Sequence, residues 1–172
     1  MSGGTDWMSL GEWVVALREL HHQARQGKLS PEDLRRYHEE RETLARAILA
    51  AQRLRAAPGA KGRQALRVAR ELLVDLHLDR GPAQFKTVDL GVGGFAVLMA
   101  VAPRVGHRLQ FSLELEPGQA IGGHVRVVNL QRKGKLYRVA FRFDGLPPEE
   151  VERVGLLVFD VALAGIDPRE ER

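Results

Sequence analysis

Apolar residues in the first part of the chain recur every three or four positions, the spacing that places them on one face of a helix. Leu10, Val14 and Leu17 form one such series, and Gly27 interrupts the pattern soon after. Glycine is favoured just beyond the last turn of a helix. The first helix is therefore expected to end near Gly27.

A second helix is expected to begin at Ser30, a favourable N-cap, with Pro31 in the first helical position. It should end by Pro58, because proline lacks the amide donor that a continuing helix needs. Its apolar face consists of Leu34, Tyr37, Leu44, Ile48 and Ala51. We expect residues 1–57 to form an antiparallel two-helix hairpin; the near-heptad spacing leaves a homodimer through these helices as the alternative.

Beyond Glu71 apolar residues recur at every second position instead of every third or fourth. Leu109, Phe111, Leu113 and Leu115 alternate with polar residues, as in a strand that buries one side. Glycine and proline turn signals separate the short runs. The predicted strands are Leu72–Leu78, Phe85–Leu90, Phe95–Val101, Leu109–Leu115, His124–Leu130 and Leu136–Phe143. Six such strands predict an antiparallel barrel or sandwich, and closure into a barrel would leave no exposed edge.

The last apolar pattern, between Pro147 and Leu163, returns to helical spacing. We expect a C-terminal helix that covers one mouth of the barrel. The predicted fold class is therefore α+β. The predicted organisation is a helical hairpin over residues 1–57, a basic linker over 58–70, a barrel with its helix over 71–165 and a tail over 166–172.

The 172-residue chain carries a formal net charge of +4, and its excess charge is concentrated in one segment. Between Thr43 and Arg70 there are basic residues and no acidic ones. These are Arg46, Arg53, Arg55, Lys61, Arg63, Arg67 and Arg70. Such a run predicts contact with something anionic.

Composition and segment patterns exclude several classes of protein. The chain has no cysteine, which excludes disulfides and thiolate catalysis. No stretch approaches the roughly 20 apolar residues of a membrane span, and no secretory signal opens the chain. We therefore expect a cytoplasmic protein.

Two short motifs stand on either side of the first two predicted strands. Arg63 and Arg67 are four residues apart, and the run Asp89-Leu-Gly-Val-Gly-Gly94 follows about twenty residues later. In type, spacing and order they resemble the RxxxR and (D/N)xSxxG motifs of the PilZ domain family. The likeness extends from about Arg63 to Leu163, and the run from Arg138 to Phe143 also looks like that family's final strand.

The resemblance implies a six-stranded barrel that binds the bacterial second messenger cyclic di-GMP, with Arg63, Arg67, Asp89, Gly91 and Gly94 at the site. The residue types suit that ligand. A guanidinium forms paired hydrogen bonds with phosphate oxygens and stacks on purines, and a carboxylate accepts from the N1 and N2 donors of guanine. Glycines would let the backbone turn tightly and approach the ligand.

Gly91 departs from the family pattern, which usually has serine at this position. The substitution removes one hydroxyl that could bond to the ligand. A net hydrogen bond contributes roughly 0.5 to 1.5 kcal/mol, and about 1.4 kcal/mol corresponds to one decade of affinity. We expect weaker binding rather than none.

The sequence supports no enzyme. It lacks GxGxxG and P-loop patterns, and its histidines form neither a HExxH motif nor a metal-ligand cluster. No catalytic residues, metal or cofactor are assigned, and we expect a receptor that acts on a downstream protein partner. Two alternatives remain: a degenerate barrel that binds proteins instead of nucleotide, and a nucleic-acid binder suggested by the basic run, which the low aromatic content disfavours.

Overall fold

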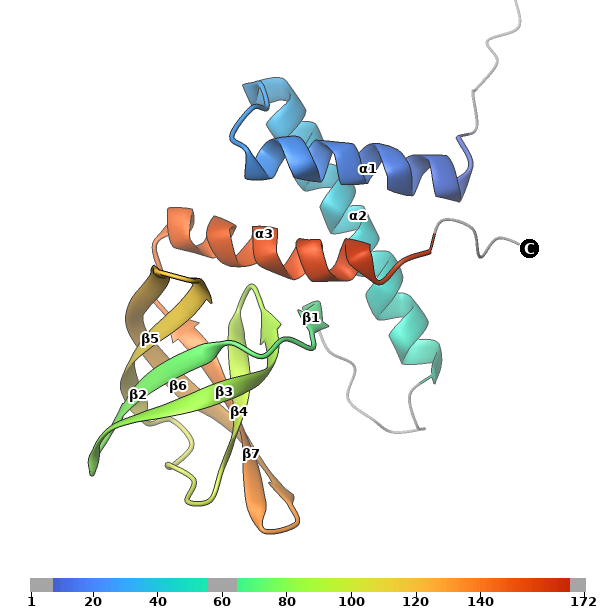
Figure 1. Cartoon of the computed structure of the whole chain (residues 1–172). Helices are drawn as coiled ribbons and strands as arrows, with labels where there is room; N and C mark the ends of the chain where they lie inside the picture. The colour runs from blue at the N-terminus through green and yellow to red at the C-terminus, as the bar shows by residue number, and fades with distance from the viewer. Residues whose placement is uncertain (1–7, 56–64, 168–172) are drawn as a thin grey trace, which may run out of the picture. The chain divides into compact units, whose positions relative to one another are not determined.

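The computed structural model describes residues 8–55 and 65–167 and contains a helical unit and a barrel unit (Figure 1). The helical unit holds α1 (Leu10–Arg25), α2 (Pro31–Arg55) and the end of α3 (Pro148–Ala164) from Phe159 onward. The barrel unit holds all strands and α3 up to Val158. Arg63 and the predicted linker residues 58–62 lie outside the described residues.

The strands of the barrel unit form a closed antiparallel barrel. Each strand pairs with its neighbours in the order β3, β2, β5, β6, β7, β4, and a further pairing between β4 and β3 closes the ring. The bounds are β2 (Leu73–Leu78), β3 (Gly81–Gly91), β4 (Gly94–Met99), β5 (Arg108–Glu116), β6 (Gln119–Lys133) and β7 (Leu136–Asp144). The predicted six-stranded barrel is confirmed.

The core of the barrel follows the alternation seen in the sequence. Along β5, Leu109, Phe111, Leu113 and Leu115 are buried while the residues between them are less so. Phe95 on β4 lies 5.3 to 6.0 Å, between ring centroids, from three other phenylalanines of the barrel. Such tilted aromatic contacts add to the stabilisation from burial alone. The residues of β5 that were predicted to face inward are therefore correct.

Two strands start earlier than the sequence predicts. β3 begins at Gly81 and β6 at Gln119, where Glu116 of β5 pairs with it. The first residues of β6, Gln119 and Ala120, are exposed. Backbone pairing continues there without burying side chains, so hydrophobic alternation gives no sign of it.

A further strand, β1 (Arg67–Val68), lies within the predicted linker. It pairs with the end of β3, Arg67 opposite Gly91 and Val68 opposite Leu90. Only two residues long, it is too short to show a period in the sequence. Its position next to Gly91 determines the geometry of the candidate site.

The predicted C-terminal helix is present as α3, and its first part belongs to the barrel unit. That part runs across one end of the barrel (Figure 1). Val154, Leu157 and Val158 are buried, and Arg153 donates a hydrogen bond to Gln119 at the start of β6, at 3.4 Å. None of the helices in the described ranges is long and apolar enough to cross a membrane.

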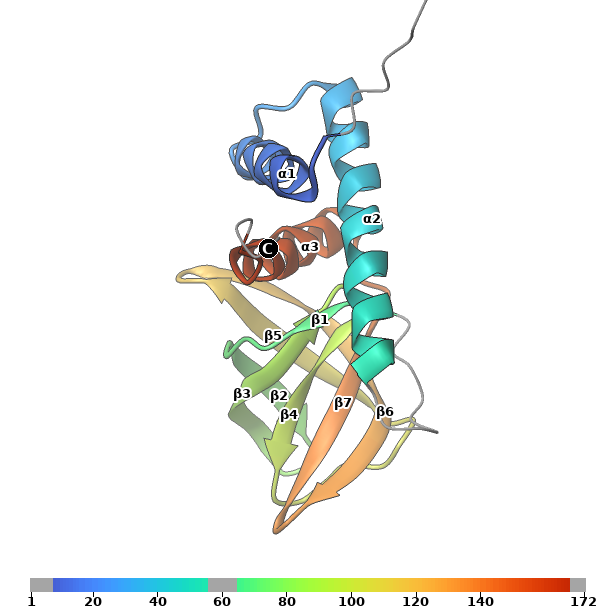
Figure 2. The ribbon, with the colours of Figure 1, turned by 90° about the vertical axis from the view of Figure 1, so that its right-hand side faces the viewer.

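The helical unit contains the predicted hairpin, whose two helices cross each other (Figure 2). Ser9 and Glu12 form a capping box at the start of α1, and Gly27 turns the chain with a φ of 67°. The buried residues of α2 are Tyr37, Leu44 and Leu49. The predicted face is correct in part, because Leu34 remains 38% exposed and Ala51 is exposed as well.

A polar cluster around the buried side chains of His21 and Tyr37 joins the three helices inside this unit. His21 Nδ1 lies 2.6 Å from the hydroxyl of Tyr37, and its Nε2 lies 3.3 Å from Asp160 on α3. Arg25 donates to the same carboxylate at 2.8 Å, and Arg41 stacks over the Tyr37 ring. Because a carboxylate only accepts, the neutral imidazole of His21 carries its proton on Nε2, and its Nδ1 then accepts from Tyr37.

Candidate ligand-binding site

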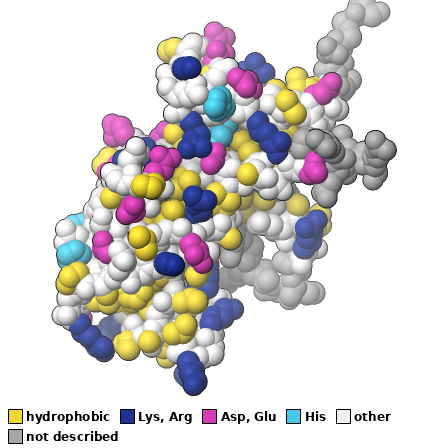
Figure 3. Space-filling model, in the orientation of Figure 1, with side chains coloured by type: hydrophobic (Ala, Val, Ile, Leu, Met, Phe, Trp, Pro, Cys, Tyr) yellow, Lys and Arg dark blue, Asp and Glu magenta, His cyan; other side chains and the backbone are white. Residues whose placement is uncertain are grey.

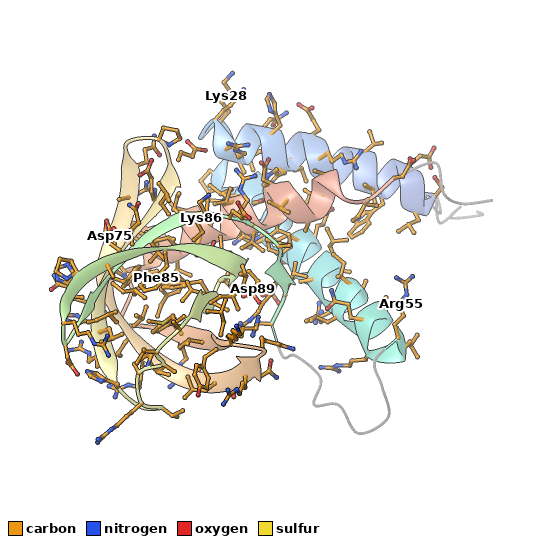
Figure 4. All side chains as sticks on the ribbon, turned by 60° about the horizontal axis from the view of Figure 1, so that its bottom comes forward. Lys28, Arg55, Asp75, Phe85, Lys86 and Asp89 are labelled. Carbon is orange, nitrogen blue, oxygen red and sulfur yellow. The ribbon has the colours of Figure 1, made fainter. Side chains whose placement is uncertain are left out.

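Asp89 is the centre of the candidate site and lies near the end of β3, beside β1 (Figure 4). Only 8% of the residue is exposed. Arg67 on β1 donates to its Oδ1 at 3.4 Å, and Arg138 on β7 donates to its Oδ2. Hydrogen bonds between charged groups are stronger than neutral ones. One buried carboxylate therefore connects three separate strands.

The position of Arg67 is fixed by its neighbours in sequence. Leu66 and Val68, on either side of it, are both buried, which anchors the segment by burial of apolar surface. Thr87 on β3, itself fully buried, donates from its hydroxyl to the carbonyl of Arg70 at 2.6 Å and accepts from the amide of Leu72 at 2.9 Å. The segment before β2 is thereby tied to β3 on both sides of Glu71.

The pairing of β3 with β4 is irregular at the site. The register shifts between Thr87 and Asp89, and such an irregularity changes the direction in which the next side chain points. Beyond it, Asp89 pairs with Ala96 and Gly91 with Gly94. The irregularity and the hairpin that follows place the carboxylate and both motif glycines within one short stretch of the barrel wall.

The two motif glycines flank the predicted tight turn and also allow close packing of the backbone. Gly91 and Gly94 pair with each other across the two-residue turn between β3 and β4, although neither has a positive φ. A Cβ on Gly91 would lie 2.9 Å from the carbonyl oxygen of Leu66, and a Cβ on Gly94 would lie 1.9 Å from that of Phe141. Both glycines allow close approach of another backbone segment: β1 in the first case and β7 in the second.

Arg138 is the site residue that sequence reasoning did not assign. It lies within the run that resembles the final strand of the PilZ family, but the run gives no sign of which side chain meets Asp89. The structure places Arg138 opposite Leu98 on β4, with β4 between it and β3. Of the five predicted site residues, the structure brings together Arg67, Asp89, Gly91 and Gly94, while Arg63 is not described.

The site combines an acceptor with two planar cations. The guanidinium groups of Arg67 and Arg138 can donate paired hydrogen bonds to phosphate oxygens, and Asp89 can accept from N–H groups. The described residues contain no group of three His, Cys, Asp or Glu side chains that could hold a metal ion. The chemistry of this arrangement is recognition of an anion that also carries N–H donors.

The family model of the PilZ domain matches residues 61–160, more than half of the chain. This chain belongs to the PilZ domain family. The match includes every predicted site residue and the whole barrel. No curated protein sequence matches the chain.

Solved structures with the same fold come from several bacteria. The inhibitor of motility (MotI/DgrA) of Bacillus subtilis is 15% identical, with a TM-score of 0.56 over 63% of this chain and 55% of its own. MrkH of K. pneumonia, solved in complex with c-di-GMP, is 16% identical, with a TM-score of 0.54 over 61% of this chain and 54% of its own.

YcgR of Escherichia coli, also solved in complex with c-di-GMP, is 17% identical, with a TM-score of 0.51. The match covers 58% of this chain and 46% of the YcgR chain. At these identities the likeness shows the shared fold. The matched region spans about half the length of each of these proteins.

Proposed function

We propose that this chain is a receptor for cyclic di-GMP that binds the nucleotide at Asp89 and acts on a downstream protein partner. The observation that supports the proposal most directly is the position of Asp89 between Arg67 and Arg138 on a PilZ barrel. Relatives of this fold, MrkH and YcgR, were solved with c-di-GMP bound. The receptor would act in the cytoplasm of a bacterium, without catalysing a reaction.

In the proposed complex Arg67 donates hydrogen bonds to a phosphate of the ligand, and Asp89 accepts hydrogen bonds from the guanine edge. Arg67 lies at 3.4 Å from Asp89, at the long end for a hydrogen bond between charged groups, and belongs to a strand of only two residues. The proposal requires that Arg67 exchange this contact for a phosphate oxygen of the ligand. Arg63, four residues earlier, would supply the second guanidinium of the motif.

Calorimetric titration with cyclic di-GMP tests the proposal. The unmodified protein should bind in the micromolar range or tighter, and Arg67→Ala should abolish or strongly weaken binding. Arg108→Ala is the matched control, because Arg108 also pairs with an aspartate of the barrel, Asp144 at 2.8 Å, outside the motif. Equal loss in both variants, or no binding by the unmodified protein, would contradict the proposal.

The proposed signal to a partner starts in the segment that carries the arginines. Ligand that bridges this segment and the barrel should slow amide hydrogen exchange across residues 58–70. Protection that saturating ligand leaves unchanged would mean that the segment takes no part in signalling.

A degenerate barrel that binds proteins instead is the second candidate. Two observations favour it: Asp89 already has charged partners within the chain, and Gly91 offers no hydroxyl. If the titration detects no binding up to millimolar ligand, this candidate is favoured. The next step would then be to identify proteins that bind the helical hairpin.

A further inference from the structure

The loop between β4 and β5 has an unusual composition for a surface segment. Its residues, numbers 100–107, read Ala-Val-Ala-Pro-Arg-Val-Gly-His. Connecting loops normally carry Ser, Thr, Asn, Asp, Gly and Pro; this loop has Pro103 and Gly106, but four of its eight residues are Ala or Val. Val101 is 59% exposed and Val105 60% exposed. The loop therefore presents aliphatic side chains to solvent on the barrel surface.

The end of this loop is held in place by the neighbouring strand. The amide of Gly106 donates to the carbonyl of Val127 at 2.7 Å, and the amide of Val127 donates to the carbonyl of His107 at 2.9 Å. Arg126 on β6 donates from its side chain to the carbonyl of Gly106 at 2.9 Å. The backbone next to the exposed Val105 is thus held against β6.

Beneath the loop lies a pocket of about 560 Å³, which it forms together with the turn between β2 and β3. Its volume is within the roughly 300 to 1,000 Å³ that is usual for small-molecule sites. The lining is Leu78, Asp79, Arg80, Val101, Ala102, Pro103, Arg104, His107 and Leu109. Leu109 is buried and Leu78 half-buried, so they form an apolar floor.

The charged side chains of the pocket have no partners among the residues that the structure describes. Neither Arg80 nor Arg104 forms an ion pair there, and neither pairs with Asp79. Two arginines and one aspartate leave one net positive charge. In Figure 3, hydrophobic side chains gather over the lower part of the barrel and Lys or Arg side chains border them.

We infer that this pocket is a second ligand site, independent of Asp89, for a small amphipathic monoanion: a carboxylate attached to a medium-length aliphatic chain. The chain would bury its apolar surface against Leu78, Val101 and Leu109. The carboxylate would receive paired hydrogen bonds from Arg80 or Arg104, for which guanidinium geometry is well suited. The single net charge of the lining matches a monoanion.

Octanoate is a suitable probe, followed by NMR of the Val and Leu methyl groups of the full chain. We expect shifts at Val101, Leu78 and Leu109. Octylammonium, with the same tail and the opposite charge, and acetate, with the same head and no tail, should shift these methyls far less. Shifts of equal size with either control compound, or none up to octanoate on the order of 10 mM, would overturn the inference.

Charge-reversal variants distinguish octanoate binding in this pocket from binding elsewhere on the surface. Arg80→Glu and Arg104→Glu should each weaken octanoate binding by at least about tenfold, which corresponds to roughly 1.4 kcal/mol. Lys135→Glu makes the same change at an exposed position between β6 and β7 that does not line the pocket, and should leave binding unchanged. If all three variants bind octanoate as the unmodified protein does, the pocket is not the site.

Discussion

Arg138 on β7 donates a hydrogen bond to the carboxylate of Asp89 on β3, although 49 residues separate them in the sequence. The strand β4 pairs with both of theirs, so the contact reaches across an intervening strand. The Asp89 side chain is 11% exposed and that of Arg138 18%. This ion pair is shielded from solvent far more than the pairs elsewhere on the barrel.

Replacing Arg138 with methionine should destabilise the barrel by about 1 to 3 kcal/mol, because a nearly buried carboxylate loses a charged partner. Urea denaturation measures the change. Arg108→Met is the matched control: Arg108 pairs with Asp144 at 2.8 Å, and both side chains are well exposed, so its loss should cost less than about 1 kcal/mol. Equal costs for the two variants would mean that burial does not strengthen the Asp89 pair.

Serine at Gly91 should displace β1 rather than only restore a hydroxyl to the site. The new Cβ would lie 2.9 Å from the Leu66 carbonyl oxygen and 3.2 Å from Cγ of Arg67, so the strand must move. We expect faster amide hydrogen exchange at Arg67 and Val68 in Gly91→Ser. Gly91→Ala brings the same Cβ without the hydroxyl and should give the same acceleration, whereas unchanged exchange in both would show that β1 tolerates the group.

The same pair of variants isolates the hydroxyl in ligand binding. Because both carry the Cβ, the ratio of their affinities for cyclic di-GMP reports the serine oxygen alone. A tighter serine variant, by up to about tenfold, is expected from one added hydrogen bond. Equal affinities would show that the hydroxyl makes no contact with the ligand.

Alanine at Gly94 should destabilise the barrel strongly. Its Cβ would lie 1.9 Å from the carbonyl oxygen of Phe141, and relief requires β4 and β7 to separate; overpacking of this kind costs about 1 to 3 kcal/mol, occasionally more. Gly93→Ala is the control, since a Cβ there meets nothing within 4 Å. Denaturant midpoints that differ little between the two variants would contradict the close approach.

The helical unit should lose stability as the pH falls below about 6.5, the ordinary pKa of histidine. Burial lowers the pKa of His21, with Arg25 and Arg41 lowering it further, while Asp160 opposes the shift. A lowered pKa means that the unfolded state binds the proton more readily, so this contribution is lost as the pH falls from 6.5 through the folded-state pKa.

The free energy of unfolding, measured by urea between about pH 7.5 and pH 5, checks this prediction. His21→Gln removes the titrating group and should flatten the part of the pH dependence that comes from His21. A variant whose pH dependence equals that of the unmodified protein would show that protonation of His21 has no net cost.

Most of the fold was predictable because burial repeats with a regular period. The alternation along β5 and the helical spacing of α1 and α3 follow directly from apolar positions. β1 and the exposed start of β6 were not predictable, because backbone pairing there buries few side chains. Leu49 rather than Ala51 is buried on α2, because the periodicity of a helix does not show which residues near its apolar face are covered by other elements.

The candidate site was predictable only in the residues that belong to a short motif. Arg67 and Asp89 are identified by their spacing and the family resemblance, and the structure brings them within 3.4 Å. Arg138 has no such signal, because its partner is set by the order of strands around the barrel. Pairing across strands that are distant in sequence is a property of the closed sheet, which a single sequence does not display.

The close approach of Phe141 to Gly94 affects how membership of this family should be interpreted. The barrel of this chain needs a residue without a Cβ at this position whether or not a nucleotide binds, because a Cβ would meet the backbone of β7. Gly94 is thus a marker of architecture and has no value for telling receptors from barrels that have lost their ligand.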